Sequence, residues 1–393
     1  MSGKSIRTVF VAMLWATMLL GANVFNTLHW GYLTYLNVLL VASLGILFFN
    51  EAKLGQRKLI IVNVIFIAML LFALPDTEGK YQSVMALSGG LVYALIYTIQ
   101  GEEYDKYLAN CRKWIVAIYL IECGLSIVER IVRYNVFSWN AEDAATMTDF
   151  DDFFGFRSFG LWGHPLQNAL ITSTIMGFIL IYDGYKPKVK YTLWAIGYAA
   201  ILCFNTRSSM VANIIFLALY QVIEASKTRS FSMKVRVIAL GIFGVAFLGL
   251  LITQTSLGGR LLEMGLLDEN SAAVRMNTWS IFDYYNLSDF LYPDEVNREI
   301  LLSRTGLYAT ENFWIDWLLK YGLIIEVIYI ALVAYNIFQY GRGYMKIDLL
   351  FLNLVFWVIA STNNSLTANP IPLFLFLAAL IIYCPTYRII EEI

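Results

Sequence analysis

The chain has 393 residues, of which 59% are hydrophobic and 15% charged, and its formal net charge is −1. This apolar share, with a mean hydropathy of +0.63, exceeds the roughly 45–50% of soluble domains and indicates that the chain folds in lipid. The near-neutral charge, without a dense basic tract, excludes nucleic acid as an expected partner. The four cysteines have no ligand-like spacing, so neither a disulfide framework nor a metal site is expected.

Apolar stretches long enough to cross a hydrocarbon core of about 30 Å as helices recur along the chain. They predict an all-α polytopic membrane protein with about twelve transmembrane helices. The predicted spans are 9–28, 32–50, 59–75, 82–99, 114–132, 166–182, 191–205, 209–225, 237–254, 312–338, 347–363 and 369–385.

The distribution of Lys and Arg tests these spans, because basic residues collect in cytoplasmic loops. Alternate loops and the two ends of the chain hold 18 of the 28 basic residues, which places both termini in the cytoplasm. The other ten then fall at or near the outer face, and nine of them follow residue 129. We therefore expect one integral membrane domain, residues 1–393, whose site faces outward.

Two predicted external segments, 133–165 and 255–311, are too long to be simple turns, and long loops tend to carry function. The first contains an acidic run at 149–152. This run is interpreted as a solvated loop, with chelation of a divalent cation as the alternative. The second alternates apolar and charged residues, which predicts short amphipathic helices on the outer membrane surface.

The sixth predicted span is preceded by Arg157 and by Gly163, His164 and Pro165. Proline suits the first turn of a helix, which leaves His164 as the cap. An imidazole that only caps the helix at the interface is one interpretation. In the other, His164 and Asn168 line a sugar-binding cavity.

Arg207 lies in the short turn between the seventh and eighth predicted spans, at the outer surface. Free N–H groups at a helix start, the hydroxyls of Ser208 and Ser209 and the guanidinium fork of Arg207 would together suit a phosphate or pyrophosphate. The alternative is an arginine that extends to the lipid headgroups.

The large external loop holds Arg260, Arg275 and Arg304, and Trp279 shares a helical face with Arg275 at a spacing of four. The nine acidic residues of this loop outnumber its four arginines. Ordinary solvated ion pairs are therefore the alternative to phosphate binding for some of these charges.

A further outer helix is predicted to begin with Thr310 as its cap and Glu311 in the first turn, where the helix dipole favours an acid. Glu311 is thus either a structural residue or part of the site. Glu122 and Glu326 lie nearer the middle of the membrane, where protonation or a buried partner would relieve the cost of the charge.

In their order and shared sidedness, these segments resemble the bacterial O-antigen polymerase and ligase family, membrane glycosyltransferases that act on undecaprenyl-pyrophosphate-linked sugars. The likeness covers roughly residues 155–340. Gly163, His164, Pro165 and Asn168 are similar to the family's glycine–His–Pro–Asn segment, and the turn around Arg207 is similar to its Ser–Arg turn.

The large external loop continues the resemblance. Arg275 followed by Trp279 is similar to the family's arginine–tryptophan helix, and Glu311 with Asn312 resembles the segment that closes the loop. Ligases of this family place a histidine before that asparagine, where this chain has Glu311. This departure favours polymerase over ligase.

The resemblance implies a GT-C-like fold in the bacterial cytoplasmic (inner) membrane. It implies that the protein polymerises undecaprenyl-pyrophosphate-linked oligosaccharide repeat units into O-antigen, as in lipopolysaccharide, or into capsular polysaccharide. Membrane lipid, a chain-length regulator and a flippase are the expected partners, and no cofactor or metal is expected.

The resemblance and the residue chemistry together predict roles at the site. Glu311, or else His164, would take the proton from the acceptor hydroxyl, and Arg207 and Arg275 would stabilise the leaving pyrophosphate. The further substrate-binding candidates are Arg157, Asn168, Arg260, Arg304, Asn312 and Trp279.

Two other functions fit the same composition. A ligase-like transferase would move finished polymer to another acceptor. A lipid-linked sugar transporter would also have about twelve spans, but carriers usually place polar sites at the middle of the membrane between repeats.

Overall fold

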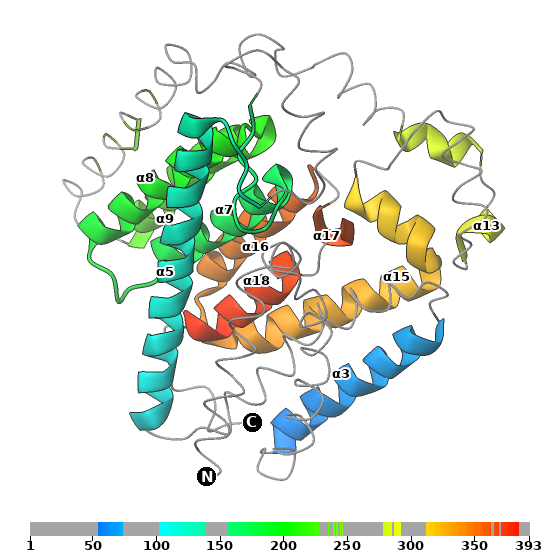
Figure 1. Ribbon diagram of the computed structural model, residues 1–393. Helices are drawn as coiled ribbons and strands as arrows, with labels where there is room; N and C mark the ends of the chain where they lie inside the picture. Colours follow the sequence, from blue (N-terminus) through cyan, green and yellow to red (C-terminus); the bar gives the residue numbers. More distant parts are fainter. Residues whose placement is uncertain are drawn as a thin grey trace, which may run out of the picture. The chain divides into compact units, whose positions relative to one another are not determined.

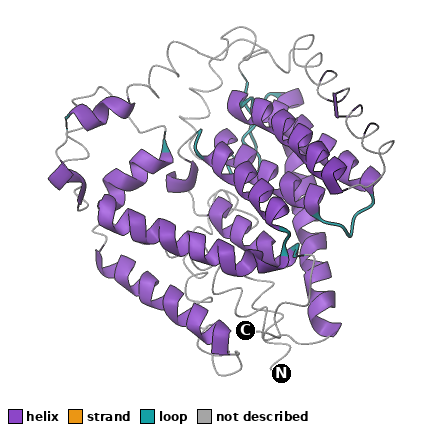
Figure 2. Cartoon of the chain, turned by 180° about the vertical axis from the view of Figure 1, so that it is seen from behind, coloured by secondary structure: helices purple, strands orange, loops and turns teal. Residues whose placement is uncertain are grey.

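The computed structural model describes residues 54–73, 102–137, 156–227, 278–284, 287–291, 312–362, 365–368 and 371–384, with a few single residues between 235 and 246. Within these residues every regular element is a helix, which confirms the predicted all-α class for the described part (Figure 2). The helices are α3 (Leu54–Ala73), α5 (Glu102–Val132), α7 (Pro165–Ile181), α8 (Pro187–Phe204), α9 (Arg207–Lys227), η3 (Ser280–Asp283), α13 (Leu287–Leu291), α15 (Phe313–Tyr340), η4 (Gly341–Gly343), α16 (Lys346–Ala360), α17 (Ser365–Ala368) and α18 (Ile371–Ile382).

Eight predicted spans coincide with described helices to within a few residues at most ends, although α5 starts twelve residues before its predicted span. The predicted spans 9–28, 32–50 and 82–99, and all but single residues of 237–254, lie outside the described residues. In the described part, Arg207–Lys227 and Phe313–Gly343 are long and apolar enough to cross a membrane, and α7 and α18 are apolar but shorter.

The chain divides into two compact units, and the division falls within α5. The first unit contains α3, the start of α5, η3, α13, α15, α17 and α18 (Figure 1). The second contains the remainder of α5 from Tyr119, together with α7, α8, α9 and α16.

In the second unit, α7 is the central helix and packs against α8, α9 and α16. Sixteen of its seventeen residues are buried, as expected for a helix that is apolar on all sides. Tyr119 joins α5 to α8 through a hydrogen bond from its hydroxyl to the Leu193 carbonyl oxygen, 2.7 Å away. These contacts hold the helix ends that carry the candidate site.

In the first unit, α15 packs against α13, α17 and α18. The side-chain amides of Asn63 on α3 and Asn336 on α15 are both fully buried and donate to each other over 3.1 and 2.9 Å. A reciprocal amide pair of this kind satisfies polar groups between two apolar helices and fixes how they pair.

Apolar side chains are exposed in rows on several helices. On α16, Leu350, Leu354 and Val358 recur every four residues and are all exposed, which places them on one face of the helix. Ile121 and Val128 on α5 are likewise more than half exposed, whereas Glu122 and Glu129 on the same helix are fully buried. The helix thus hides its acids and presents apolar groups, the reverse of the pattern in water.

Candidate functional site

The residues before α7, 156–163, form an irregular segment that packs against the end of α5. Gly160 and Gly163 in this segment both have positive φ, +56° and +72°. All eight residues except Arg157 are buried. Buried irregular backbone needs partners for its N–H groups, and in this segment two glutamates of α5 supply them.

Glu129 accepts three backbone hydrogen bonds. Its Oε2 atom accepts from the N–H groups of Phe159 and Gly160, each at 2.9 Å, and Oε1 accepts from the N–H of Val136 at 2.9 Å. One carboxylate therefore joins the chain just after α5 to the chain just before α7. Successive N–H groups directed at one oxygen form the kind of concave anion-binding turn that a carboxylate fits.

Glu122 lies two turns earlier on the same face of α5. Its Oε2 atom accepts from the Leu161 N–H at 2.6 Å, while Oε1 is buried without a hydrogen-bond partner in the described part of the chain. A Cβ atom at Gly160 would lie 2.1 Å from Glu122 Oε1. Glycine is thus required at position 160 both for its φ and for the space beside the carboxylate.

Other side chains complete the contacts between the segment and its surroundings. Ser158 donates its hydroxyl to the Ser126 carbonyl oxygen at 2.7 Å. Arg130 donates to the carbonyl of Phe156, and the side-chain amide of Asn168 donates to the carbonyl of Phe159. The segment is therefore bonded to both α5 and α7 along its length.

The same segment also runs beside the C-terminal end of α8. The Ser158 N–H donates to the Cys203 carbonyl oxygen at 3.1 Å, and Arg157 Nε donates to the Phe204 carbonyl oxygen at 3.3 Å. Asn205 ends α8 in the left-handed conformation, with φ 55°. The next helix, α9, begins at Arg207, so Arg157 lies beside the turn that leads to Arg207.

The start of α9 is polar and partly enclosed. Arg207 and Ser208 are half-buried, and the Thr206 and Ser209 hydroxyls are buried without a hydrogen-bond partner among the described residues. Thr362, just after α16, donates its hydroxyl to Ser208 Oγ at 3.0 Å. Free N–H groups, hydroxyls and a guanidinium at one helix start are suited to an anion.

His164 occupies the N-cap position of α7 with Pro165 at the first turn, as predicted, but its side chain makes no capping hydrogen bond. The interpretation as a capping imidazole is therefore wrong. The ring is largely enclosed although the residue keeps some exposed surface. Burial, and secondly the nearby Arg157 cation, lower the pKa of His164 to about 4. The imidazole is neutral at pH 7 and can accept a hydrogen bond.

Four of the predicted site residues thus lie in one region of the second unit: Arg157, His164, Asn168 and Arg207. Asn168 is fully buried and its amide is used to hold the 156–163 segment. The structure gives it a supporting contact rather than an open surface.

The predicted site residues of the other unit are placed separately. Asn312 is the N-cap of α15 and its Oδ1 accepts from the Trp314 N–H at 3.0 Å. The helix starts at Phe313, so Thr310 is not its cap and Glu311 is not in its first turn. Trp279 caps η3, is 59% exposed and contacts Phe282 at a ring-centroid distance of 5.9 Å. Arg260, Arg275, Arg304 and Glu311 lie outside the described residues.

Glu129 is the residue that the sequence analysis missed. The sequence feature that could have indicated Glu129 is its spacing of seven residues from Glu122. This spacing places two acids on the same face of a helix that is otherwise able to span a membrane. No sequence feature shows that two of its three partners are backbone N–H groups 30 and 31 residues away.

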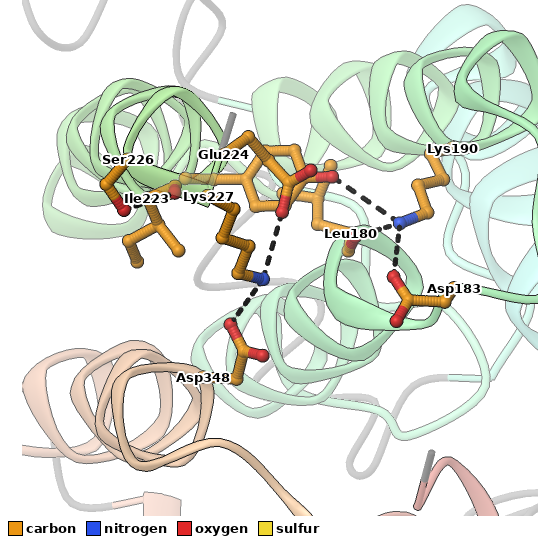
Figure 3. Close-up of polar contacts among 9 residues, drawn as sticks. Leu180, Asp183, Lys190, Ile223, Glu224, Ser226, Lys227 and Asp348 are labelled. Carbon is orange, nitrogen blue, oxygen red and sulfur yellow. Dashed lines mark hydrogen bonds and ion pairs between the residues drawn. The ribbon is translucent and has the colours of Figure 1, made fainter. Parts of the chain in front are cut away.

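The opposite ends of the same helices carry a charged cluster (Figure 3). Lys190 Nζ donates to the Leu180 carbonyl oxygen at 2.7 Å and lies 4.0 Å from Asp183 Oδ1. Lys227 Nζ lies 3.0 Å from Glu224 Oε1 and 2.9 Å from Asp348 Oδ1. The cluster ties the C-terminal ends of α7 and α9 to the N-terminal ends of α8 and α16.

Among the described residues no group of three or more His, Cys, Asp or Glu is placed to hold a metal ion. Comparison with known protein families, curated proteins and solved structures finds no match to this chain. The chemistry of the site therefore rests on the residues themselves.

Proposed function

We propose that this protein is a polytopic glycosyltransferase of the bacterial inner membrane that polymerises oligosaccharide repeat units carried on undecaprenyl pyrophosphate. The observation that carries the proposal is the position of Arg157, which lies near His164 and donates to the Phe204 carbonyl oxygen just before α9 begins at Arg207, on helix ends predicted to face outward. A cationic helix start beside a neutral imidazole suits a pyrophosphate leaving group and a sugar hydroxyl.

The membrane arrangement is part of the proposal. It comprises about twelve spans in a GT-C-like fold, with both termini in the cytoplasm and the polymer made on the outer face. Exposed apolar rows on α5 and α16 support it, since lipid tails would cover them, and so do the buried acids of α5.

The proposed reaction is a single displacement at the anomeric carbon of the growing chain. An acceptor hydroxyl oxygen on the next lipid-linked repeat unit forms the new glycosidic bond as the bond to the pyrophosphate oxygen breaks. Arg207 and Arg275 stabilise the negative charge on the departing undecaprenyl pyrophosphate. Glu311 takes the hydroxyl proton, with His164 as the other candidate base.

The test is mass spectrometry of undecaprenyl-linked glycans in cells that lack the protein, compared with cells that carry it on a plasmid. Polymerase function predicts single repeat units on lipid and loss of polymer. Full-length polymer left on lipid would instead indicate a ligase, and units held on the cytoplasmic leaflet would indicate a transporter.

The role of Arg207 is tested in the same cells. Arg207→Ala should remove polymer with no loss of folded protein, because no other group of the α9 start supplies a guanidinium to the leaving group. Arg133→Ala is the matched control, since Arg133 is an exposed arginine of the same predicted face, and it should retain polymer. Normal polymer in Arg207→Ala would contradict the assignment of the pyrophosphate to α9.

A further inference from the structure

We propose that Glu129 is the positioning residue of this site, holding Arg157 and His164 in place through the backbone of the 156–163 segment. The effect of this positioning on polymer synthesis rests on the proposed function. The positioning of the two side chains does not depend on that function and can be measured separately.

The first support for this positioning role is the location of the three N–H groups that donate to Glu129. They join Val136 to Phe159 and Gly160, which lie 23 and 24 residues further along the chain. Closing a loop of this size costs conformational entropy. Together with Asn135 Oδ1, which also accepts from the Phe159 N–H at 3.2 Å, the carboxylate provides the fixed point from which the chain reaches α7.

The second support is the short path from this fixed point to the two site residues. Arg157 lies two residues before Phe159, and the Gly163 N–H donates to the Phe159 carbonyl oxygen at 3.0 Å, which places His164 one residue further. Because both paths begin at Phe159, one displacement of that peptide would move Arg157 and His164 together.

The third support is the free-energy cost of burying the Glu129 carboxylate. Glu129 is fully buried on a helix whose exposed face is apolar, and removing a carboxylate from water is costly unless hydrogen bonds compensate. The Ser158 hydroxyl and the amides of Asn135 and Asn168 also hold this segment, and as neutral groups they do so without that cost. Residues that break the usual local pattern, such as an acid buried on an apolar helix, concentrate at functional sites.

Glu122 gives a matched comparison on the same helix. Only its Oε2 atom accepts a backbone N–H, that of Leu161, so Glu122→Gln retains an acceptor for it. In Glu129→Gln the new amide N–H₂ must face at least one backbone N–H, because both oxygens of Glu129 are acceptors. The two variants make the same change of side chain but differ in the bonds they break.

The experiment measures the imidazole pKa of His164 by NMR on purified full-length protein with isotope-labelled histidine. The chain has two histidines, His29 and His164, and His29→Asn assigns the signal. Glu129→Gln should raise the pKa of His164 from about 4 toward the ordinary value near 6.5, because the ring is released from its enclosure. Glu122→Gln should leave this pKa unchanged.

Polymer yield in cells is the second readout. Misplacement of reacting groups by about 1 Å costs roughly a hundredfold in rate, so Glu129→Gln should reduce polymer at least tenfold while Glu122→Gln reduces it little. An unchanged His164 pKa in Glu129→Gln would overturn the proposal, whatever the yield. A shifted pKa with no polymer lost in the deletion strain would retain the positioning and reject the proposed function.

If Glu129→Gln does not accumulate as folded protein, Ser158→Ala is measured instead. This variant removes only the hydroxyl contact to the Ser126 carbonyl and should move the His164 pKa upward by a smaller amount. A His164 pKa unaltered by Ser158→Ala would then count against the proposal.

Discussion

At the scale of single residues, the two acids of α5 illustrate how one residue type serves two different purposes. Glu129 uses both oxygens on backbone N–H groups, while Glu122 uses one and fills the space beside Gly160. The partners of both acids are main-chain groups, which stay the same when neighbouring side chains change. Arg157 and His164 therefore depend on the backbone path more than on the side chains around it.

His164 also makes the stability of the protein depend on pH. Its pKa is about 4 when folded and about 6.5 when unfolded, so the unfolded state binds more protons between these values. Stability should therefore fall as pH drops from 7 to 4.5, by roughly 1–2 kcal/mol from this residue after allowance for solvent screening. Thermal unfolding in detergent at both pH values checks this, because His164→Gln should lose less stability than the unaltered protein. An equal loss in both would contradict it.

At the scale of elements, α15 is broken rather than continuous. Gly322 has φ 73° and ψ 156° inside the helix, and Figure 1 shows two arms that meet at an angle. The first arm, from Phe313, carries Ile315 and Leu319, which form a core with Ile281 and Phe290 of η3 and α13. The break thus directs the Asn312 end of α15 toward the short helices of the large loop.

Gly322 should not tolerate a side chain. The φ and ψ values at this position are essentially restricted to glycine, and a residue forced there costs about 1–3 kcal/mol. Gly322→Ala should therefore lower the midpoint of thermal unfolding in detergent. Gly341→Ala is the control, since Gly341 ends the same helix with φ −82°, which alanine adopts freely. Equal midpoints for the two variants would show that α15 straightens without cost.

The sequence predicted which segments are helices better than it predicted the residues at which those helices begin and end. The lengths of the apolar stretches predicted α7, α9 and α16 to within a few residues. A helix that crosses lipid must satisfy its backbone hydrogen bonds internally over a fixed thickness. The start of α15 was misplaced because Thr310 and Asn312 are both residue types that cap helices well, and the structure has the cap at Asn312, whose backbone is extended. The break at Gly322 gave no signal, since glycine is common in membrane helices.

At the scale of the molecule, the helices of the second unit end in two chemically different regions. One end brings together the 156–163 segment, the start of α9 and Thr362. The other holds the charged cluster of Lys190, Lys227 and Asp348. The sequence predicted the first region through Arg157, His164 and Arg207. It could not predict Glu129, because contacts to distant backbone leave no pattern in the side chains.

These two regions should lie on opposite sides of the membrane. Tyr134, just after α5, and Lys188, at the start of α8, are both exposed and are predicted to be outside and inside. In a Cys384→Ser background, a membrane-impermeant maleimide should label Tyr134→Cys in intact spheroplasts and Lys188→Cys only after permeabilisation. Labelling of both variants in intact spheroplasts would contradict the proposed topology.

The buried acids of α5 also bear on how the chain enters the membrane during synthesis. A charged residue near the centre of a helix opposes insertion by about 2.5–3.5 kcal/mol, and α5 carries Glu122 and Glu129, whose N–H partners in the 156–163 segment follow 30 to 39 residues later. When α5 leaves the ribosome those partners do not yet exist. The helix should therefore insert poorly when it is the last segment made, and become stable in the bilayer only once the chain to α7 has been synthesised.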